Sequence, residues 1–238
     1  MARETLTREK IVQTAIEMLD EEGLDGLNMR SLGERLGSAA TAVYWHVKNK
    51  ENLVALAGDE LWNEVRLPDL GTVDWRTAAT GMAKDQYAML TRHPWLVQTI
   101  GLQVLYGPGK ARHDDHALAV YEMAGFVGGE ADQAVAITFM FVLGSAFGEA
   151  ASASLRMQVG RQGGDVDKRL REIVGQHMEV AKQFPRLRAR FESVDSSDYY
   201  AAPEKSFEMG LEAIFDGLER QLRPAKPVTE SRVRGWFA

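Results

Sequence analysis

The chain has 238 residues, no cysteine and a formal net charge of −6 at pH 7. The absence of cysteine excludes disulfides and thiolate metal sites and suits a reducing cytoplasm. The acidic total argues against a nonspecific nucleic-acid coat protein, but residues 28–50 carry four basic side chains against one acidic side chain. A basic segment on an acidic body is compatible with specific DNA binding.

Neither a membrane segment nor a signal peptide is indicated. No stretch approaches the 18 uncharged apolar residues that suggest a transmembrane helix. The first residues, "MARETLTREK", lack the apolar run of a signal peptide. We therefore expect a soluble, cytoplasmic protein with no membrane partner.

The apolar spacing is helical along nearly the whole chain, which predicts an all-α fold. Thr7 is placed to cap a first helix, and Gly23 is placed to stop it. Asn28 is placed to cap a second helix, which Gly37 ends in a left-handed conformation. The first 40 residues therefore predict two capped helices with a glycine turn after the second.

The remaining helices are predicted in the same way. Residues 40–47 form a third helix, and Asn49 caps a fourth that reaches about Leu67, where a linker begins. Further helices are expected at residues 74–92, 94–105, 114–124, 130–158, 166–184 and 203–222. The resulting units are an N-terminal domain, a larger helical domain and a disordered tail, at residues 1–50, 51–223 and 224–238.

The stretch "TAVYWHVKNK", residues 41–50, carries the strongest functional signal. If Val43 and Val47 face inward, the helical period turns Thr41 and Trp45 outward and leaves Tyr44 on the flank. A short helix after a glycine turn, packed on a preceding short helix, is typical of a helix-turn-helix motif, whose second helix enters the major groove of DNA. The alternative is that Tyr44 and Trp45 only pack against neighbouring helices.

Basic and amide residues near this helix suggest further DNA contacts. Arg30, in the first turn of the second helix, is placed to reach a guanine edge or a phosphate. Lys50 and the free N–H groups after Asn49 offer a clamp on the DNA backbone. His46 can donate to a phosphate, or it can form a local hydrogen bond as a half-buried ring.

Residues 7–56, with "VYWHVKNK", resemble the DNA-binding domain of the TetR family of bacterial repressors, and "FEMGLEAIFDGLERQL", residues 207–222, resembles the last helix of the tetracycline-repressor-like regulatory domain. The resemblance implies an all-α homodimer with a three-helix DNA-binding domain and a larger domain in which a small molecule binds and releases a palindromic operator. Ala40 replaces a polar residue of tetracycline-binding members, so the base preference should differ. The DNA contacts carried over by position are Arg30, Ala40, Thr41, Ala42, Tyr44, Trp45, His46 and Lys50.

Two segments are candidates for the dimer interface. Gly144, Gly148 and Ala151 form a small-residue stripe that lets another helix approach closely, and the last helix has a wide apolar stripe. The alternative is that these faces bury each other within one subunit. The expected interface residues are Gly144, Gly148, Phe207, Leu211, Phe215 and Leu218.

Residues 82–147 are rich in large, soft side chains, which are compatible with a plain core or with a pocket. The histidine that holds magnesium with the drug in tetracycline-binding members has no counterpart, because its position falls near Ile100. We therefore expect an apolar or polycyclic effector and neither a cofactor nor a metal. The candidate pocket residues are Met82, Gln86, Gln103, Tyr106, His113, Met123, Phe126 and Phe139.

An enzyme is the rival class of function. Its best evidence is "HDDH", in which His113, Asp114, Asp115 and His116 could ligate a metal. At the start of the helix predicted at 114–124, however, these acids would serve as ordinary capping residues. Neither a phosphate-binding loop nor a nucleophile elbow is completed, so an enzyme is not expected.

Overall fold

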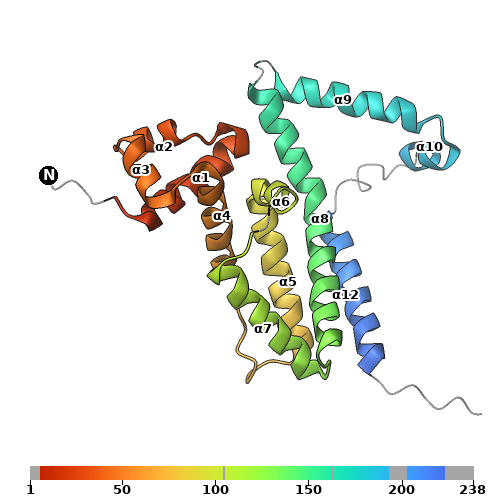
Figure 1. The fold of residues 1–238 in the computed structure, drawn as a ribbon. Helices are drawn as coiled ribbons and strands as arrows, with labels where there is room; N and C mark the ends of the chain where they lie inside the picture. Colours follow the sequence, from red (N-terminus) through yellow and green to blue (C-terminus); the bar gives the residue numbers. More distant parts are fainter. Residues whose placement is uncertain (1–5, 104, 162, 164, 193–202, 223–238) are drawn as a thin grey trace, which may run out of the picture.

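The computed structural model describes residues 6–103, 105–161, 163, 165–192 and 203–222. These residues form helices and no β-strand, so the predicted all-α class is confirmed. Figure 1 shows a small N-terminal group of helices that one helix joins to a longer bundle, from which two further helices project. The predicted tail at 224–238 lies outside the described residues.

The N-terminal helices begin at the predicted caps. They are α1 (Arg8–Gly26), α2 (Met29–Arg35), α3 (Ala40–Val47) and α4 (Lys50–Leu61). The side chains of Thr7, Asn28 and Asn49 each accept a hydrogen bond from the backbone N–H three residues further on, at 3.2, 2.9 and 2.7 Å. We call α1–α3 the head; its core contains aliphatic side chains with no exposed area, such as Ile11, Leu19, Leu32, Val43 and Val47.

Two features of the head backbone differ from the prediction or were not predicted. The first helix does not end at Gly23; it bends there, with φ 67°, and continues to Gly26. After α3, Lys48 has φ 64° and ψ −57°, and the N–H of Asn49 donates to the carbonyl of Val47 at 2.8 Å. This is a γ-turn of the rare, strained kind.

The fourth helix is shorter than predicted. A 3₁₀ turn, η1 (Trp62–Glu64), follows α4, and the chain is extended at Val65. Pro68 opposes the predicted end at Leu67, because a proline disfavours the helical conformation of the residue before it. The extended segment after η1 is held by Arg66, whose guanidinium donates two hydrogen bonds to Asp85, at 2.7 and 2.9 Å.

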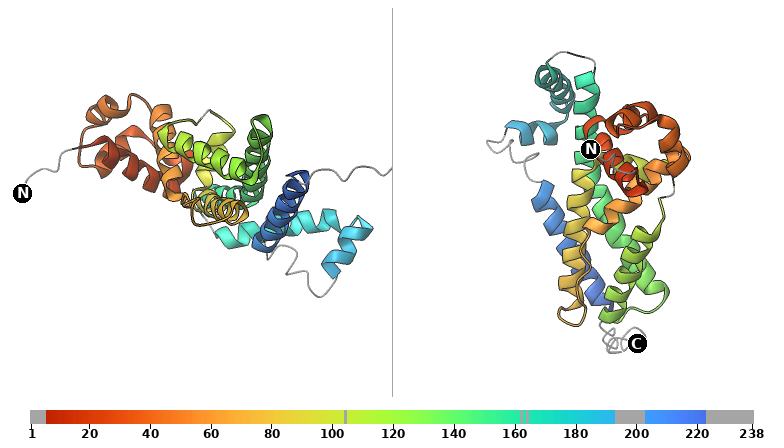
Figure 2. Two further views of the ribbon diagram at one scale, coloured as in Figure 1. Left: turned by 90° about the horizontal axis from the view of Figure 1, so that it is seen from below. Right: turned by 90° about the vertical axis from the view of Figure 1, so that its left-hand side faces the viewer.

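The helices from α5 onward form the body, with α8 at its centre. They are α5 (Trp75–Arg92), α6 (Pro94–Ile100), α7 (Pro108–Ala124), α8 (Gly129–Arg161), α9 (Val166–Ala181), α10 (Pro185–Glu192) and α12 (Pro203–Leu222). α8 packs against α5, α6, α7 and α12. The two views in Figure 2 show α9 and α10 projecting beyond the bundle from the end of α8. The helix predicted at 166–184 ends at Ala181, and α10 was not predicted.

α7 begins six residues before its predicted start, and α6 ends before its predicted end. Pro108 occupies the first turn of α7, where its missing N–H costs nothing. The N–H groups of Gly109 and Lys110 donate to the carboxylate of Asp59, at 3.0 and 2.9 Å. These contacts extend α7 toward α4, so the "HDDH" stretch lies inside the helix and its predicted capping role was wrong.

α8 differs from the expectation that no segment is long and apolar enough to resemble a transmembrane helix. It is the one helix of the described ranges that is long and apolar enough to cross a membrane, judged by length and composition alone. It packs here against six other helices, namely α1, α5, α6, α7, α9 and α12. Only 28% of its most apolar window is buried within this chain, however, so much of that apolar surface is left uncovered.

α12 uses its apolar face within the protomer. Phe207 stacks on Tyr87 with ring centroids 4.4 Å apart, and a side chain at Gly210 would collide with the Phe141 ring. This chain itself buries four of the predicted interface residues, to 0–4% exposure: Phe207, Leu211, Phe215 and Leu218. Their burial within one protomer fits the alternative in which these faces are covered inside the subunit.

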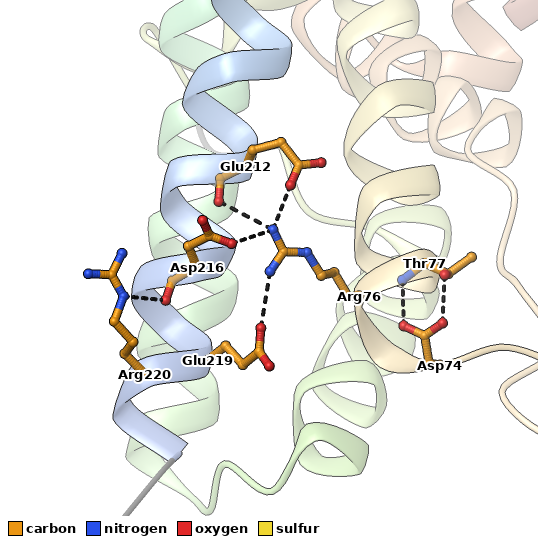
Figure 3. A network of polar contacts seen from close by, with 7 residues as sticks. All are labelled: Asp74, Arg76, Thr77, Glu212, Asp216, Glu219 and Arg220. Carbon is orange, nitrogen blue, oxygen red and sulfur yellow. Dashed lines mark hydrogen bonds and ion pairs between the residues drawn. The ribbon is translucent and has the colours of Figure 1, made fainter. Parts of the chain in front are cut away.

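The polar side of α12 is held by one arginine. Figure 3 shows Arg76 of α5 reaching toward three carboxylates of α12. Its guanidinium donates to Glu212, Asp216 and Glu219 at 2.5, 2.6 and 3.2 Å. These carboxylates, the first two above all, raise the pKa of Arg76 further. Arg76 therefore connects the last helix to the start of α5.

Candidate functional site

The recognition helix α3 has the predicted register. Val43 and Val47 have no exposed area, whereas Trp45 is 86% and Tyr44 45% exposed. Thr41 is also exposed, and Ala42 lies at intermediate depth. A tryptophan exposed to this degree stabilises nothing within the chain, so the surface of α3 is available to a partner.

The flanking basic residues fall into two groups. Arg30 is exposed and pairs only with Glu34, four residues on, at 3.1 Å, a surface pair that is easily exchanged for a phosphate or base. Lys50 instead donates from Nζ to the backbone carbonyl of Leu24 at 2.7 Å and ties α4 to α1. The free phosphate clamp predicted at Lys50 is therefore replaced by an internal contact. Ala40 and His46 lie half-buried at the two ends of α3.

The body contains a cavity of about 310 Å³ between α5, α7 and α8. Four of the predicted pocket residues line it, namely Met82, Gln86, His113 and Phe139. Gln103 lines a neighbouring cavity of about 430 Å³, and Lys110 and Phe139 line both cavities. The two cavities are thus separated by a wall that these two side chains share.

Three predicted pocket residues lie outside both cavities. Tyr106 precedes α7 and is 68% exposed, and Met123, near the end of α7, is 41% exposed. Phe126 is buried against the ring of Tyr121, at 6.2 Å between centroids, and belongs to the core.

Gln86 is the least satisfied polar group of the first cavity. Its side chain is 3% exposed, and its Nε2 has no hydrogen-bond partner among the described residues. An unpaired buried amide donor destabilises a ligand-free protein by about 1 to 3 kcal/mol. A ligand acceptor beside Gln86 would remove this cost.

Lys110 was missed by the sequence analysis. Its ammonium lies 4.8 Å from the Trp62 ring centroid and 5.2 Å from that of Phe139, and it pairs with Asp114. Burial favours a raised pKa for Asp114, but the hydrogen bond with His113 and the Lys110 charge outweigh it and hold the pKa below its usual range. Lys110 and Asp114 therefore form a paired, charged end of the cavity.

A hydroxyl pair lies in the same wall. The hydroxyls of Tyr121 and Thr138 are 2.5 Å apart. Burial raises the pKa of Tyr121 to about 12, although the hydrogen bond with Thr138 opposes this shift. The phenol is therefore neutral at physiological pH and presents a polar but uncharged surface. No pattern in the sequence marked this pair, because its members lie on different helices.

A third cluster connects the head to the body. His93, 4% exposed between α5 and α6, contacts Asp20 of α1 through Nδ1 at 2.7 Å and Glu64 of η1 through Nε2 at 3.2 Å. Trp95 donates from Nε1 to the same Asp20 oxygen at 2.8 Å. Arg92 donates to Glu64 at 2.5 Å. Movement of α6 therefore acts directly on a carboxylate of the head.

The "HDDH" residues do not assemble a metal site. His113 and Asp114 line the cavity, Asp115 is exposed, and the Nε2 of His116 is buried without a partner among the described residues. In the described part of the chain, no three histidine, aspartate or glutamate side chains are grouped closely enough to hold a metal ion.

The chain matches two family profiles. Residues 11–57 match "Bacterial regulatory proteins, tetR family", and residues 67–222 match "Tetracyclin repressor-like, C-terminal domain". The first region covers most of the head and α4, and the second spans the body up to the end of α12. Together the profiles account for both domains of the fold.

Curated relatives agree over most of the chain. It is 30% identical to the tetracycline repressor protein class A of Escherichia coli, over 89% of each chain. It is 28% identical to the HTH-type transcriptional repressor DrrR1 of Streptomyces coeruleorubidus, over 90% of this chain and 78% of that one. An HTH-type regulator of Saccharopolyspora erythraea is 35% identical, but the match covers 60% of this chain and 61% of that relative.

Solved structures show the same fold. A possible TetR family regulator of Streptomyces coelicolor is 28% identical, with a TM-score of 0.71 over 91% of this chain and all of that one. ActR of the same organism, in complex with actinorhodin, is 24% identical with a TM-score of 0.71 over 92% and 99% of the two chains. With a helix-turn-helix head, a cavity-bearing helical body and matches over both, the chain belongs to the TetR family of transcriptional regulators, which are not enzymes.

Proposed function

We propose that this regulator is a cytoplasmic repressor that binds a palindromic operator as a homodimer and is released by a mainly apolar, multi-ring effector. The observation that carries the DNA-binding part is the 86% exposure of Trp45 on a helix whose valines are fully buried. A recognition helix must project its reading side chains, and α3 does so. Two curated relatives that match along most of their length are named as repressors, which supports repression.

The proposed DNA contacts divide by role. The phenol of Tyr44 suits a phosphate, and the indole edge of Trp45 suits a thymine methyl group. Arg30 and Thr41, both exposed, are placed for base edges or phosphates. Ala40, Ala42 and His46 are half-buried against the core of the head, where they limit how closely α3 approaches the groove wall. Lys50 acts indirectly, because its ammonium holds α4 against α1.

The proposed dimer surface combines α8 with the outer face of α12. A side chain at Gly144 or Gly148 would meet no atom within 4 Å in the described part of the protomer. Met140 and Phe147 on α8 are 61% and 64% exposed, and Met209 on α12 is 73% exposed. A small-residue stripe flanked by exposed large apolar residues is suited to packing against a copy of itself.

The proposed effector site is the cavity between α5, α7 and α8. Its walls are largely apolar, with Met82 and Phe139 among them, and Gln86 supplies an unsatisfied donor. Ile100, near the position of the magnesium-binding histidine in tetracycline-binding members, lines the second cavity and offers no metal ligand. We therefore expect binding without magnesium, and we expect Gln103 to contribute only if the effector extends into the second cavity.

The route from cavity to head runs through two elements. η1 contributes Trp62, which lies 4.7 Å from the His113 ring, and Glu64, which contacts His93. α6 contributes Trp95, which is bonded to Asp20 of the head. Recognition helices fit successive major grooves only when they are about 34 to 36 Å apart, so a modest rotation of each head breaks the register.

Selection of binding sites from random duplex DNA tests the proposal, and it does not require that the operator sequence be known. The purified full chain should recover an inverted repeat, and Trp45→Ala should recover less of it at the same protein concentration. Recovery of single, unrepeated half-sites would contradict the homodimer on its operator. Release of the selected duplex by an apolar multi-ring compound in the presence of a chelator tests the effector part.

A further inference from the structure

The charged groups around the first cavity are unevenly paired. Lys110 forms an ion pair with Asp114, and the Nδ1 of His113 also contacts the Asp114 carboxylate. Asp132, on the first turn of α8, lines the same cavity and is exposed, so it lies at the rim. No cation of the described chain lies within ion-pairing distance of Asp132. Because Lys110 and Asp114 pair with each other, Asp132 leaves the cavity with one unpaired carboxylate.

The second observation is the amide of Gln86. The residue is almost fully buried, at 3% exposure, lines the cavity, and holds an Nε2 donor without a partner among the described residues. A carbonyl oxygen of a ligand would satisfy this donor. An ammonium would not, because it has no acceptor. A carboxylate could accept the bond, but burying its charge would be costly because Lys110 is already paired with Asp114.

From these two groups we infer that the effector carries a carbonyl acceptor, which Gln86 binds, and a basic amine, which Asp132 binds at the rim. The inference rests on the proposed function of this cavity. Asp132 and Phe139, the latter beside Lys110, are seven residues apart on α8, which is two turns or roughly 10 Å. A rigid aromatic scaffold spans that length, with its rings against Met82 and Phe139 and its amine toward solvent.

Glu130 is a matched control for the possibility that Asp132 only stabilises the start of α8. An acidic side chain in the first turn of a helix interacts favourably with the helix dipole, and Glu130 in the same turn does so too. Glu130 is exposed but does not line the cavity. If Asp132 serves only the helix, Asp132→Asn and Glu130→Gln should behave alike.

Isothermal titration of the full chain with three anthraquinones tests the inference. The probes carry an aminomethyl, a hydroxymethyl or a carboxylate group on the same ring carbon, so they share the rings and the carbonyls. The amine should bind about fivefold more tightly than the neutral probe, as expected for one exposed ion pair. That advantage should shrink at high salt, disappear in Asp132→Asn and persist in Glu130→Gln.

The other outcomes separate the inference from the proposed function. Equal binding of the amine and the neutral probe, with binding of both weakened in Gln86→Leu, would overturn the amine and leave the cavity as the effector site. Preference for the carboxylate, lost in Lys110→Met, would overturn the inferred polarity. Failure of all three probes to bind the folded wild type would overturn the multi-ring effector and the inference with it. Thermal unfolding of each variant verifies that it is folded.

Discussion

The head and the body place their large and polar side chains in opposite ways. In the head, aliphatic side chains fill the core and the aromatic pair Tyr44 and Trp45 faces solvent. In the body, Trp95 and polar groups such as Gln86 are buried, as is Trp62 of the adjoining η1. A surface that reads DNA must project its side chains, whereas a site that senses a small molecule must enclose it. Unusual exposure therefore marks the site in the head, and unusual burial of polar atoms marks it in the body.

The largest effect is expected at the proposed dimer surface, which joins two bodies. Gly148→Leu should overpack a close helix contact by roughly 1 to 3 kcal/mol at each symmetric position. Sedimentation should show a shift from dimer to monomer, with the monomer folded, because a Cβ at Gly148 would meet no neighbouring side chain or helix within 4 Å among the described residues. Gly210→Leu is the contrasting variant, since it collides with Phe141 inside one chain and should lower the thermal stability of the protomer itself. A dimer that persists at nanomolar concentration in Gly148→Leu would place the interface elsewhere.

The next effect concerns the exposed aromatics of the head. Trp45→Ala should weaken binding to the selected operator by roughly 1 to 3 kcal/mol, the range for one specific base contact, and leave thermal stability unchanged. Val47→Ala, at a fully buried position two residues away, should do the reverse and lower stability first. Fluorescence anisotropy with operator and random duplexes measures the first effect. Equal weakening on both duplexes would show that Trp45 does not read sequence.

The link between the two regions is tested at His93. His93→Ala leaves Asp20 and Glu64 without the ring that they share, and it should lower the free energy of unfolding by about 2 kcal/mol. Arg92→Ala removes a more exposed partner of the same Glu64 and should cost less than about 1 kcal/mol. Denaturant unfolding provides both values. If the two variants cost the same, the histidine contact is not the principal connection.

The smallest expected effect is an increase in the free energy of unfolding, whereas most substitutions lower it. Gln86→Leu removes an unpaired buried amide, so it should raise the free energy of unfolding of the ligand-free chain by about 1 kcal/mol. The same substitution should weaken binding of a carbonyl-bearing probe, because the donor is lost. Thermal unfolding with and without the neutral anthraquinone measures both effects. A destabilised variant would indicate that Gln86 is already satisfied in the free protein.

The features predicted well from sequence are those that a few neighbouring residues determine. The caps at Thr7, Asn28 and Asn49 and the outward register of Trp45 are confirmed. Each is determined by groups no more than four residues apart in the chain. The start of α7 was missed because Asp59, fifty residues earlier, satisfies its first N–H groups. No local pattern contains that information.

The same distinction explains the errors in the site. The apolar stripe of α12 showed that one face is buried but not which surface buries it, so residues such as Phe215 were assigned to a partner subunit instead of the core. Lys50 was read as a free cation because its acceptor, the carbonyl of Leu24, leaves no signature in the side-chain sequence. Of the eight predicted pocket residues, Met82, Gln86 and His113 line the first cavity. Tyr106, Met123 and Phe126, near the ends of α7, line neither cavity.

The strained turn at Lys48 has a consequence for how the head moves. A non-glycine residue in this conformation costs of order 1 to 3 kcal/mol, so its surroundings must hold it in place. They do: Asn52 donates to the carbonyl of Val47 at 3.0 Å, and Lys50 fastens the next turn to α1. The joint between α3 and α4 is therefore stiff and cannot serve as a hinge. The recognition helix and α4 therefore rotate as one rigid body, so a rotation of α4 turns the DNA-reading surface through the same angle.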